Sequence, residues 1–414
     1  MECHFCLQKE QLIKMNIALF IDNKLDSGGA FQCSLSNILN LIKNSDKEYK
    51  FKIFTTIKEN LHLFEGKTIE VIYIKYGFIN KLFSYVRKAN RFSKYIKFLT
   101  LNRPLKLDAV FAKYEIDLVY FVSSSPLARD IEAHNFIYTL WDLCHLDHPE
   151  FPEVSFYGEF ESRQALFNEV LPKATNIIVE SEMGKQNLIK KFNIDADRIT
   201  ILPVLPSDNN YSQKEFSTNI NVDIKTKYLL KGDYIFYPAQ FWAHKNHIYI
   251  LEGIKILIDK GYKINAIFSG SDKGNLKYIL KNIKKMNLED SVKYIGFVDN
   301  NELSCLYKQA LALVMPTYFG PTNLPPYEAF LNNCPVLYSD LPGLRDQVKD
   351  SALLMNLKDP ESLANNLIKI INKEPELIKM MKNAESLTEN LEQIYMKEQK
   401  KIFDNFSLKR KCWD

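Results

Sequence analysis

Two side chains of this sequence, Lys245 and Glu328, stand where chemistry on a phosphate or a sugar could take place. Lys245 follows an apolar run, residues 233–239, and precedes a helical pattern, so it belongs to a loop between a strand and a helix. We expect Glu328 in the first turn of a helix that Pro325 and Pro326 open, because proline suits that turn. A lysine ammonium is a point charge that binds phosphate, and a carboxylate accepts hydrogen bonds from sugar hydroxyls. A diphosphate beside a ribose would suit Glu328 and the start of its helix, whereas a lone lysine in a loop is ordinarily a surface residue.

The loop before this helix follows a second apolar run, residues 312–315, which predicts a short buried strand. A helix N-terminus at the carboxyl end of a strand offers backbone N–H groups to phosphate. We therefore expect residues 322–324 to contribute N–H groups to a bound diphosphate. The candidate positions in this loop are Gly320, Pro321, Thr322, Asn323 and Leu324.

Two ordered motifs in this part of the chain resemble the donor-site signature of the GT-B retaining glycosyltransferases of family 4. The motifs are Pro316-Thr-x6-Leu324-Pro-Pro-x-Glu328-Ala and Cys334-Pro-Val-x-x-Ser-Asp340-x-Pro-Gly343. An ordinary strand–turn–helix unit of an α/β domain is the alternative, but the ordered combination is long for a chance match. The resemblance implies a nucleotide-diphosphate sugar as co-substrate, with no metal and no cofactor.

This chain departs from the family pattern at two positions. The family has two glutamates eight positions apart; Glu328 matches the second, and Gly320 stands at the first. The family also has an arginine followed five positions later by a lysine; Lys245 matches the lysine, and Gln240 stands at the arginine. The resemblance implies that the backbone near Val298 holds the nucleobase. We expect the sugar to be held differently from the family, with Asn323 or Thr322 replacing part of the missing contact.

The first half of the chain offers weaker signals. Gly28 and Gly29 lie between an apolar run, residues 16–22, and a helical pattern, so a ligand could approach the backbone closely there; a plain tight turn is the alternative. The resemblance implies that this loop faces the donor. His145 follows a predicted strand, residues 135–142, and could orient an acceptor hydroxyl or a developing charge; a surface histidine is the alternative. His145 and a nearby histidine have the spacing of a metal pair, but we expect no metal.

The length of 414 residues suits two α/β domains rather than one core. Strands alternate with helices in both halves, which predicts two doubly wound Rossmann-like domains facing across a cleft, and the resemblance implies the GT-B arrangement. Seven scattered cysteines form no disulfide framework, and neither a signal peptide nor a membrane-spanning run is visible, so we expect a cytoplasmic protein. The expected units are an extension (1–14), an acceptor domain (15–210), a donor domain (211–390) and a helix that crosses back to the first domain (391–414).

Residues 75–106 form a basic segment with interleaved aromatic residues and no acidic residue. A basic amphipathic helix of this kind indicates binding to an anionic membrane surface, here the inner face of the membrane. A solvated helix that packs on its own domain is the main alternative, and RNA binding is a weaker one. Across the whole chain, 54 basic residues against 50 acidic residues give a net charge of +4, which argues against nucleic acid as a partner.

These features together predict a retaining glycosyltransferase. It would move a sugar from a nucleotide-diphosphate sugar to a glycan or lipid-linked acceptor in cell-surface polysaccharide or glycoconjugate synthesis. The candidate catalytic residues are Lys245, Glu328 and His145. A sugar-nucleotide epimerase on a similar fold is one alternative, and a non-catalytic sugar-binding or scaffold protein is another.

Overall fold

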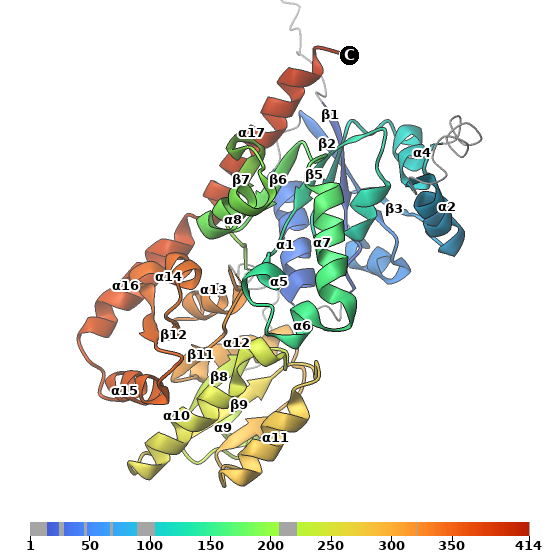
Figure 1. Cartoon of the computed structure of the whole chain (residues 1–414). Coiled ribbons are helices and arrows are strands. Elements are labelled where there is room, and N and C mark those ends of the chain that lie inside the picture. The colour runs from blue at the N-terminus through green and yellow to red at the C-terminus, as the bar shows by residue number, and fades with distance from the viewer. Residues whose placement is uncertain are drawn as a thin grey trace, which may run out of the picture.

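The chain folds into two α/β domains, each built on a parallel sheet with helices on both faces (Figure 1). The structure is a computed structural model. It describes residues 15–24, 29–44, 48–66, 69–88, 104–206, 222–320 and 322–413. Among the candidate positions, Gly28 and Pro321 lie outside the described residues, as do the expected extension 1–14 and residues 207–221 at the expected domain boundary.

The first domain contains a seven-stranded sheet with the strand order β3-β2-β1-β4-β5-β6-β7, and every neighbouring pair is parallel. The strands are β1 (Met15–Phe20), β2 (Tyr49–Thr55), β3 (Val71–Tyr73), β4 (Leu118–Phe121), β5 (Asn135–Thr139), β6 (Asn176–Val179) and β7 (Ile199–Ile201). The helices are α1 (Gly29–Asn44), η2 (Lys58–Phe64), α2 (Phe78–Lys88), α4 (Lys106–Lys113), η3 (Pro126–Asp130), α5 (Cys144–Asp147), α6 (Pro152–Ser155), η4 (Phe156–Gly158), α7 (Glu159–Val170), α8 (Glu182–Phe192) and η5 (Ala196–Arg198).

The apolar character of the central strands explains why both faces of this sheet are covered. Ile17 and Leu19 of β1 enter one hydrophobic core, whereas Ala18 and Phe20 enter another on the opposite face. Successive side chains of a strand point to opposite faces, so a continuous apolar run needs helices on both sides.

The second domain contains a six-stranded parallel sheet with the order β10-β9-β8-β11-β12-β13. The strands are β8 (Asp233–Pro238), β9 (Ile264–Ser269), β10 (Val292–Tyr294), β11 (Ala312–Met315), β12 (Val336–Ser339) and β13 (Leu353–Met355). The helices are α9 (Ile224–Lys227), η7 (Ala243–Lys245), α10 (His247–Asp259), α11 (Leu276–Lys285), α12 (Asn300–Gln309), α13 (Leu324–Leu331), α14 (Pro342–Val348), η8 (Lys349–Ser351), α15 (Pro360–Ile371) and α16 (Glu376–Glu389).

The last helix, α17 (Leu391–Arg410), returns to the first domain (Figure 1). The ring of Phe403 packs against Tyr49 at a centroid distance of 5.3 Å, and the Tyr49 hydroxyl donates to Asp404. Arg410 forms a 2.7 Å ion pair with Asp117 near the start of β4. These contacts attach the C-terminal end of the chain to the first sheet.

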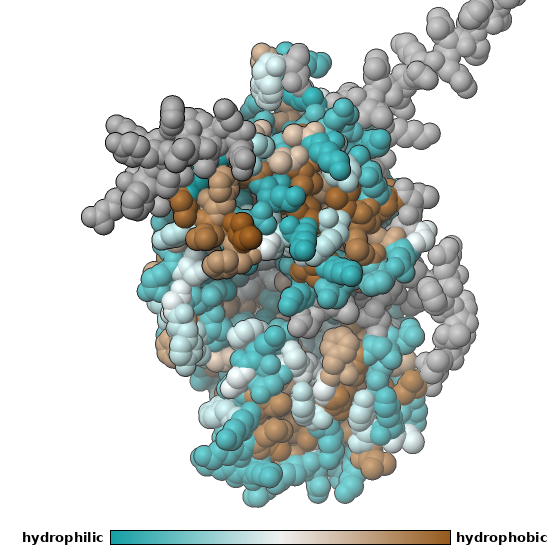
Figure 2. Space-filling view, turned by 90° about the vertical axis from the view of Figure 1, so that its right-hand side faces the viewer, coloured by the Kyte–Doolittle hydropathy of each residue, from teal (hydrophilic) through white to brown (hydrophobic). Residues whose placement is uncertain are grey.

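Part of the basic segment forms α2, and residues 89–103 lie outside the described residues. Figure 2 shows hydrophobic side chains gathered on the surface of the first domain. On α2 the exposed apolar side chains are Phe78 (77%), Ile79 (80%), Leu82 (49%) and Tyr85 (73%). These positions recur at helical spacing, so the apolar face of α2 points to solvent and not into its own domain. No helix in the described part of the chain is long and apolar enough to cross a membrane.

Candidate active site

The switch point of the second sheet places the two predicted donor loops side by side. β8 and β11 are hydrogen-bonded neighbours, while β9 and β12 continue the sheet in opposite directions. Loops that follow such a strand pair diverge and leave a crevice at the carboxyl edge of the sheet, where α/β folds bind ligands. The loop after β8 carries Lys245, and the loop after β11 leads into α13.

Lys245 and Asn323 meet in this crevice. The Lys245 Nζ donates a hydrogen bond to the Asn323 Oδ1 at 3.1 Å, although the residues are 78 positions apart. Burial lowers the pKa of Lys245 to about 8. The charges of Cys144, Asp142 and Glu153 act in the opposite direction but do not offset the cost of burying the ammonium. The site therefore favours an additional anion near Nζ.

Asn323 is held firmly by the side chains around it. Its Nδ2 donates to the Tyr338 hydroxyl at 2.7 Å and to the Gly320 carbonyl at 3.3 Å. Its backbone N–H donates to Gln347 at 3.0 Å, and the Gln347 Nε2 donates back to the Asn323 carbonyl. Asn323 is therefore a positioning residue for Lys245, a role that the sequence did not indicate.

Gly320 is explained by the same network. Its φ is +106°, and a Cβ added there would lie 3.3 Å from the Asn323 Oδ1 and 3.4 Å from its Nδ2. Side chains other than glycine rarely adopt this backbone conformation, and the space beyond the Cα is filled by the asparagine amide. Gly320 and Asn323 thus form a matched pair in place of the glutamate that the family pattern has.

The N-terminus of α13 offers fewer backbone donors than the sequence suggested. Asn323 is the N-cap residue, and prolines stand in the first turn, where they have no N–H to donate. The N–H of Asn323 is already bound to Gln347, which corrects the expectation that residues 322–324 all offer theirs. Leu324 begins the helix and is buried. Lys245 consequently supplies most of the positive potential beside this helix end.

Glu328 is the fifth residue of α13, just past the first turn in which it was predicted, because the helix begins at Leu324 and not at Pro325. Its Oε2 accepts a hydrogen bond from the Tyr307 hydroxyl at 2.8 Å. Burial raises the pKa of Glu328, and the hydrogen bond from Tyr307 acts in the opposite direction. Tyr307 therefore fixes one carboxylate oxygen and leaves the other as an acceptor.

The remaining candidates of the second domain line neighbouring loops. The Gln240 Oε1 accepts from the Trp242 Nε1 at 3.1 Å, so an indole holds the amide that replaces the family arginine. Val298 is buried and follows Phe297, whose side chain is 84% exposed. An exposed aromatic ring next to the predicted nucleobase position offers a stacking surface.

Two predicted site residues of the first domain differ in their distance from the loop that leads into α13, here called the donor loop. Gly29 lies beside this loop, and His145 does not. A Cβ at Gly29, the first residue of α1, would lie 4.0 Å from Leu324, so the two helix N-termini face each other. His145 is fully buried between the rings of Phe160 and Phe167, and its Nε2 contacts Gln164 at 3.2 Å. Burial lowers the pKa of His145. This histidine faces α7 and has no access to a substrate in this structure.

The neighbouring loop histidine, His148, contacts the second domain. Its ring stacks on Phe319 at a centroid distance of 5.5 Å. Across the described residues, no group of three or more histidine, cysteine and acidic side chains could hold a metal ion. Phe319 also stacks on His244 at 3.9 Å, so two histidines from opposite domains contact this ring.

Glu153 of α6 joins the domains next to Lys245. Its Oε1 accepts from the backbone N–H of His244 at 2.8 Å and lies 2.5 Å from the His244 Nδ1. Burial acts to raise the pKa of Glu153, but the hydrogen bonds from His244 lower it overall. Burial, followed by the charge of Lys245, lowers the pKa of His244 to about 4.

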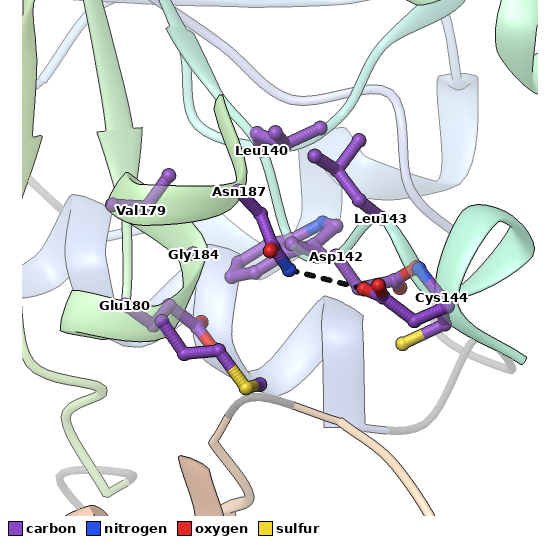
Figure 3. Close-up of a pocket in the computed structure, with 11 residues that line it drawn as sticks. Leu140, Asp142, Leu143, Cys144, Val179, Glu180, Gly184 and Asn187 are labelled. Atoms are coloured by element: carbon purple, nitrogen blue, oxygen red, sulfur yellow. Dashed lines mark hydrogen bonds between the residues drawn. The ribbon is translucent and has the colours of Figure 1, made fainter. Parts of the chain in front are cut away.

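A pocket of about 340 Å³, open to solvent, lies at the carboxyl edge of the first sheet (Figure 3). It is lined by the segments after β5 and β6, including Asp142, Cys144, Glu180, Met183 and Asn187. The segment after β6 touches the donor loop of the second domain, where the Thr322 hydroxyl donates to the Glu180 Oε2. Burial raises the pKa of the Cys144 thiol, and the nearby Gly320 backbone acts in the opposite direction.

Glu180 was not predicted from the sequence as a residue of the site. The available signal is a carboxylate placed directly after an apolar strand and before the helix N-cap Ser181. That position is the carboxyl edge of a parallel sheet, where α/β proteins bind ligands.

Comparison with solved structures identifies the class of fold. The chain superposes on Anabaena Alr3699/HepE, solved in complex with UDP and glucose, with a TM-score of 0.70 and 17% identity over 94% of this chain and 100% of that one. It also superposes on WaaG, a glycosyltransferase involved in lipopolysaccharide biosynthesis, with a TM-score of 0.63 and 15% identity over 92% and 97%. The fold is therefore GT-B, as the sequence predicted.

Sequence comparison finds a family match in the second domain and several relatives. Residues 223–387, which lie in the second domain, match the family described as glycosyl transferases group 1. The O-antigen chain mannosyltransferase RfbU of Salmonella typhimurium is 25% identical over 206 residues, which are 50% of this chain and 53% of that protein. An Escherichia coli UDP-Gal:alpha-D-GlcNAc-diphosphoundecaprenol alpha-1,3-galactosyltransferase is 25% identical over 47% of this chain and 51% of that protein. The chain thus matches about half the length of these relatives.

Proposed function

We propose that this protein is a glycosyltransferase that moves a sugar from a nucleotide-diphosphate sugar to a glycan or lipid-linked acceptor in polysaccharide synthesis. The observation that carries the proposal is the Lys245 ammonium, which Asn323 holds beside the N-terminus of α13 within a glycosyl transferases group 1 domain. The names of the matched relatives, which act on O-antigen chains and on a diphosphoundecaprenol-linked sugar, support this class of acceptor.

The chemistry assigned to Lys245 is stabilisation of the leaving group. Cleavage of the bond between the sugar and the diphosphate leaves negative charge on the diphosphate while the sugar becomes oxocarbenium-like. A preorganised ammonium in a partly buried site stabilises that charge without reorganising at the moment of reaction. Because Asn323 is in turn fixed by Tyr338 and Gln347, Lys245 is held in place before the donor arrives.

Glu328 would bind the ribose hydroxyls of the donor. Tyr307 occupies one oxygen of this carboxylate, so the other would accept from the ribose. The backbone near Val298 and the exposed ring of Phe297 would hold the nucleobase. The proposal includes retention of configuration, which follows the family resemblance, and it assigns no catalytic role to His145.

The proposal also places the protein at the cytoplasmic face of a membrane. The exposed apolar side chains of α2 lie within a segment that carries lysine and arginine and no acidic residue. Such a helix combines apolar insertion with attraction to anionic lipid, and each basic residue near the surface adds about 1 kcal/mol. A lipid-linked acceptor would then be presented to the first domain.

Thermal-shift measurements with UDP, UDP-glucose, UDP-galactose, GDP and GDP-mannose test this function. A ligand at a hundredfold excess over its Kd adds about 2.7 kcal/mol of apparent stability. We expect at least one sugar nucleotide to raise the melting midpoint and to be hydrolysed slowly without an acceptor. An epimerised sugar nucleotide as product would support the epimerase instead, and binding without turnover would support a sugar-binding protein. If no compound binds and none is turned over, the proposed function is wrong.

A further inference from the structure

Glu180 of the first domain contacts the donor loop of the second. It directly follows β6, and its Oε2 accepts from the Thr322 hydroxyl, two residues after Gly320. Its Oε1 accepts weakly from the Cys33 thiol at 3.8 Å. The same residue lines the pocket at the carboxyl edge of the first sheet, where Figure 3 shows it across from Asp142. Glu180 is therefore a carboxyl group at the boundary between the pocket and the donor loop.

The surroundings of Glu180 do not balance a negative charge. Burial raises its pKa to about 8, and the groups that act on it next are Thr322, Cys33 and Asp142. None of these three is a cation, and Asp142 opposes ionisation. By contrast, Asp142 in the same pocket forms a 3.0 Å ion pair with Arg163. A buried carboxyl without a balancing cation lowers the stability of the free protein, so its presence needs a functional reason.

The second observation is the missing carboxylate in the donor loop itself. Gly320 has no side chain, and the Asn323 amide fills the space where one would start. The wall of the pocket reaches this loop through Glu180, which accepts from Thr322, while Cys144 lies near the Gly320 backbone. A sugar attached to a diphosphate at Lys245 would extend from the crevice towards this segment.

We propose that Glu180 supplies from the first domain the carboxyl group that Gly320 lacks in the second, and that it forms hydrogen bonds with hydroxyl groups of the donor sugar. This inference rests on the proposed function. Thr322 and Cys33 donate to one oxygen of the carboxyl group each, and each oxygen keeps a further hydrogen-bonding position. Two positions remain for a pair of sugar hydroxyls.

In this arrangement the carboxyl group that binds the sugar belongs to the first domain and not to the donor loop of the second. Glu180 and Lys245 belong to different domains, so the sugar and the diphosphate are held by opposite sides of the cleft. Nucleotide diphosphate alone needs only the second domain, whereas the full donor needs both. Sugar recognition is then coupled to closure of the cleft over the donor.

Calorimetry with matched ligands tests the inference. The ligand pair is UDP and UDP-glucose, UDP and UDP-galactose, or GDP and GDP-mannose, whichever binds the parent protein. We expect Glu180→Ala to leave the affinity for the nucleotide diphosphate within about twofold and to weaken the full donor by about 10- to 100-fold, the usual loss when a buried polar group is left without its hydrogen-bond partner. Glu180→Gln keeps the size of the side chain and one acceptor, and we expect a smaller loss in the same direction.

Glu182→Gln is the control, because Glu182 lies two residues further on and is exposed on α8. It should bind both ligands as the parent does. Melting midpoints of all variants show whether each is folded, and Glu180→Gln serves if Glu180→Ala is not. Unchanged affinity of both Glu180 variants for the full donor, or equal loss of the nucleotide and the full donor, would overturn the inference and leave the proposed function standing. If the parent binds no compound of the panel, the proposed function fails and this inference fails with it.

Discussion

Replacing Lys245 by methionine should make the free protein more stable and abolish its response to nucleotide. The reason is that the ammonium is partly buried and has a neutral partner, the Asn323 Oδ1. Methionine keeps an unbranched side chain of similar length, so it retains the packing of the methylene groups while it removes the charge. A residue that lowers stability but binds an anion is the expected signature of a functional site.

The magnitude follows from the pKa of Lys245, which burial lowers from 10.5 to about 8. Each pKa unit corresponds to about 1.4 kcal/mol, so the cost of burying the charge at pH 7 is at most about 3.5 kcal/mol. Loss of the hydrogen bond leaves the Asn323 Oδ1 without its donor, which costs about 1–2 kcal/mol. The net gain is about 1.5–2.5 kcal/mol, or roughly 3–10 °C in the melting midpoint of a domain of this size.

The pH dependence of this gain has a definite sign. Below the folded pKa of about 8 the lysine is charged in both states, so the cost of burial is fully present. As the pH rises from 8 towards the unfolded value of about 10.4, the folded lysine loses its proton first and the cost disappears. The difference between Lys245→Met and the parent should therefore be largest at pH 7 and small at pH 10.

Differential scanning fluorimetry at both pH values, with and without UDP or GDP, measures these effects. Lys277→Met is the control, because Lys277 is exposed on α11. A Lys245→Met variant that melts below the parent at pH 7 would refute the charge-burial argument. A variant that responds to nucleotide as strongly as the parent would remove Lys245 from the diphosphate site.

Two further predictions concern the donor loop and the surface of α2. Gly320→Glu restores the family carboxylate. Because position 320 has a positive φ and the new side chain would contact Asn323, we expect the variant to be less stable by about 1–3 kcal/mol and to bind nucleotide more weakly in calorimetry. Tighter binding of a sugar nucleotide would show that the position accepts a side chain. Replacing Phe78 and Tyr85 by serine should reduce co-sedimentation with phosphatidylglycerol vesicles, whereas Ile378→Ser, an exposed residue of α16, should not. Equal sedimentation of the α2 variant and the parent would favour a solvated helix.

The sequence by itself determined the elements of the second domain and the loops that bear its site. The strand predicted at residues 312–315 is β11, with the same bounds. The apolar runs before Lys245 and before Gly320 end in loops at the switch point, because buried parallel strands are continuously apolar and their pattern stops where the loop begins. Lys245 and the N-terminus of α13 meet there as a direct consequence of strand order.

Contacts between residues that are distant in the chain could not be predicted from local sequence patterns. His145 has the residue type and the place expected of a site residue, yet packing against α7 buries it. Asn323 was expected to contact the sugar, but its amide is bound to Lys245 and Tyr338. A local pattern shows that a side chain is polar, but it does not show which polar group meets it.

Tertiary structure alone decided where the second carboxylate lies. Glu180 and Thr322 are 142 positions apart and belong to different domains, so their hydrogen bond exists only when the two sheets face each other. In the sequence, the glycine at position 320 indicated the loss of a carboxylate that binds the sugar. In the folded chain its space is filled by Asn323, and a carboxyl group from the other domain lies beside the same loop. The physical reason is that apolar periodicity encodes which face of an element is buried, whereas the approach of two domains depends on contacts that no local pattern contains.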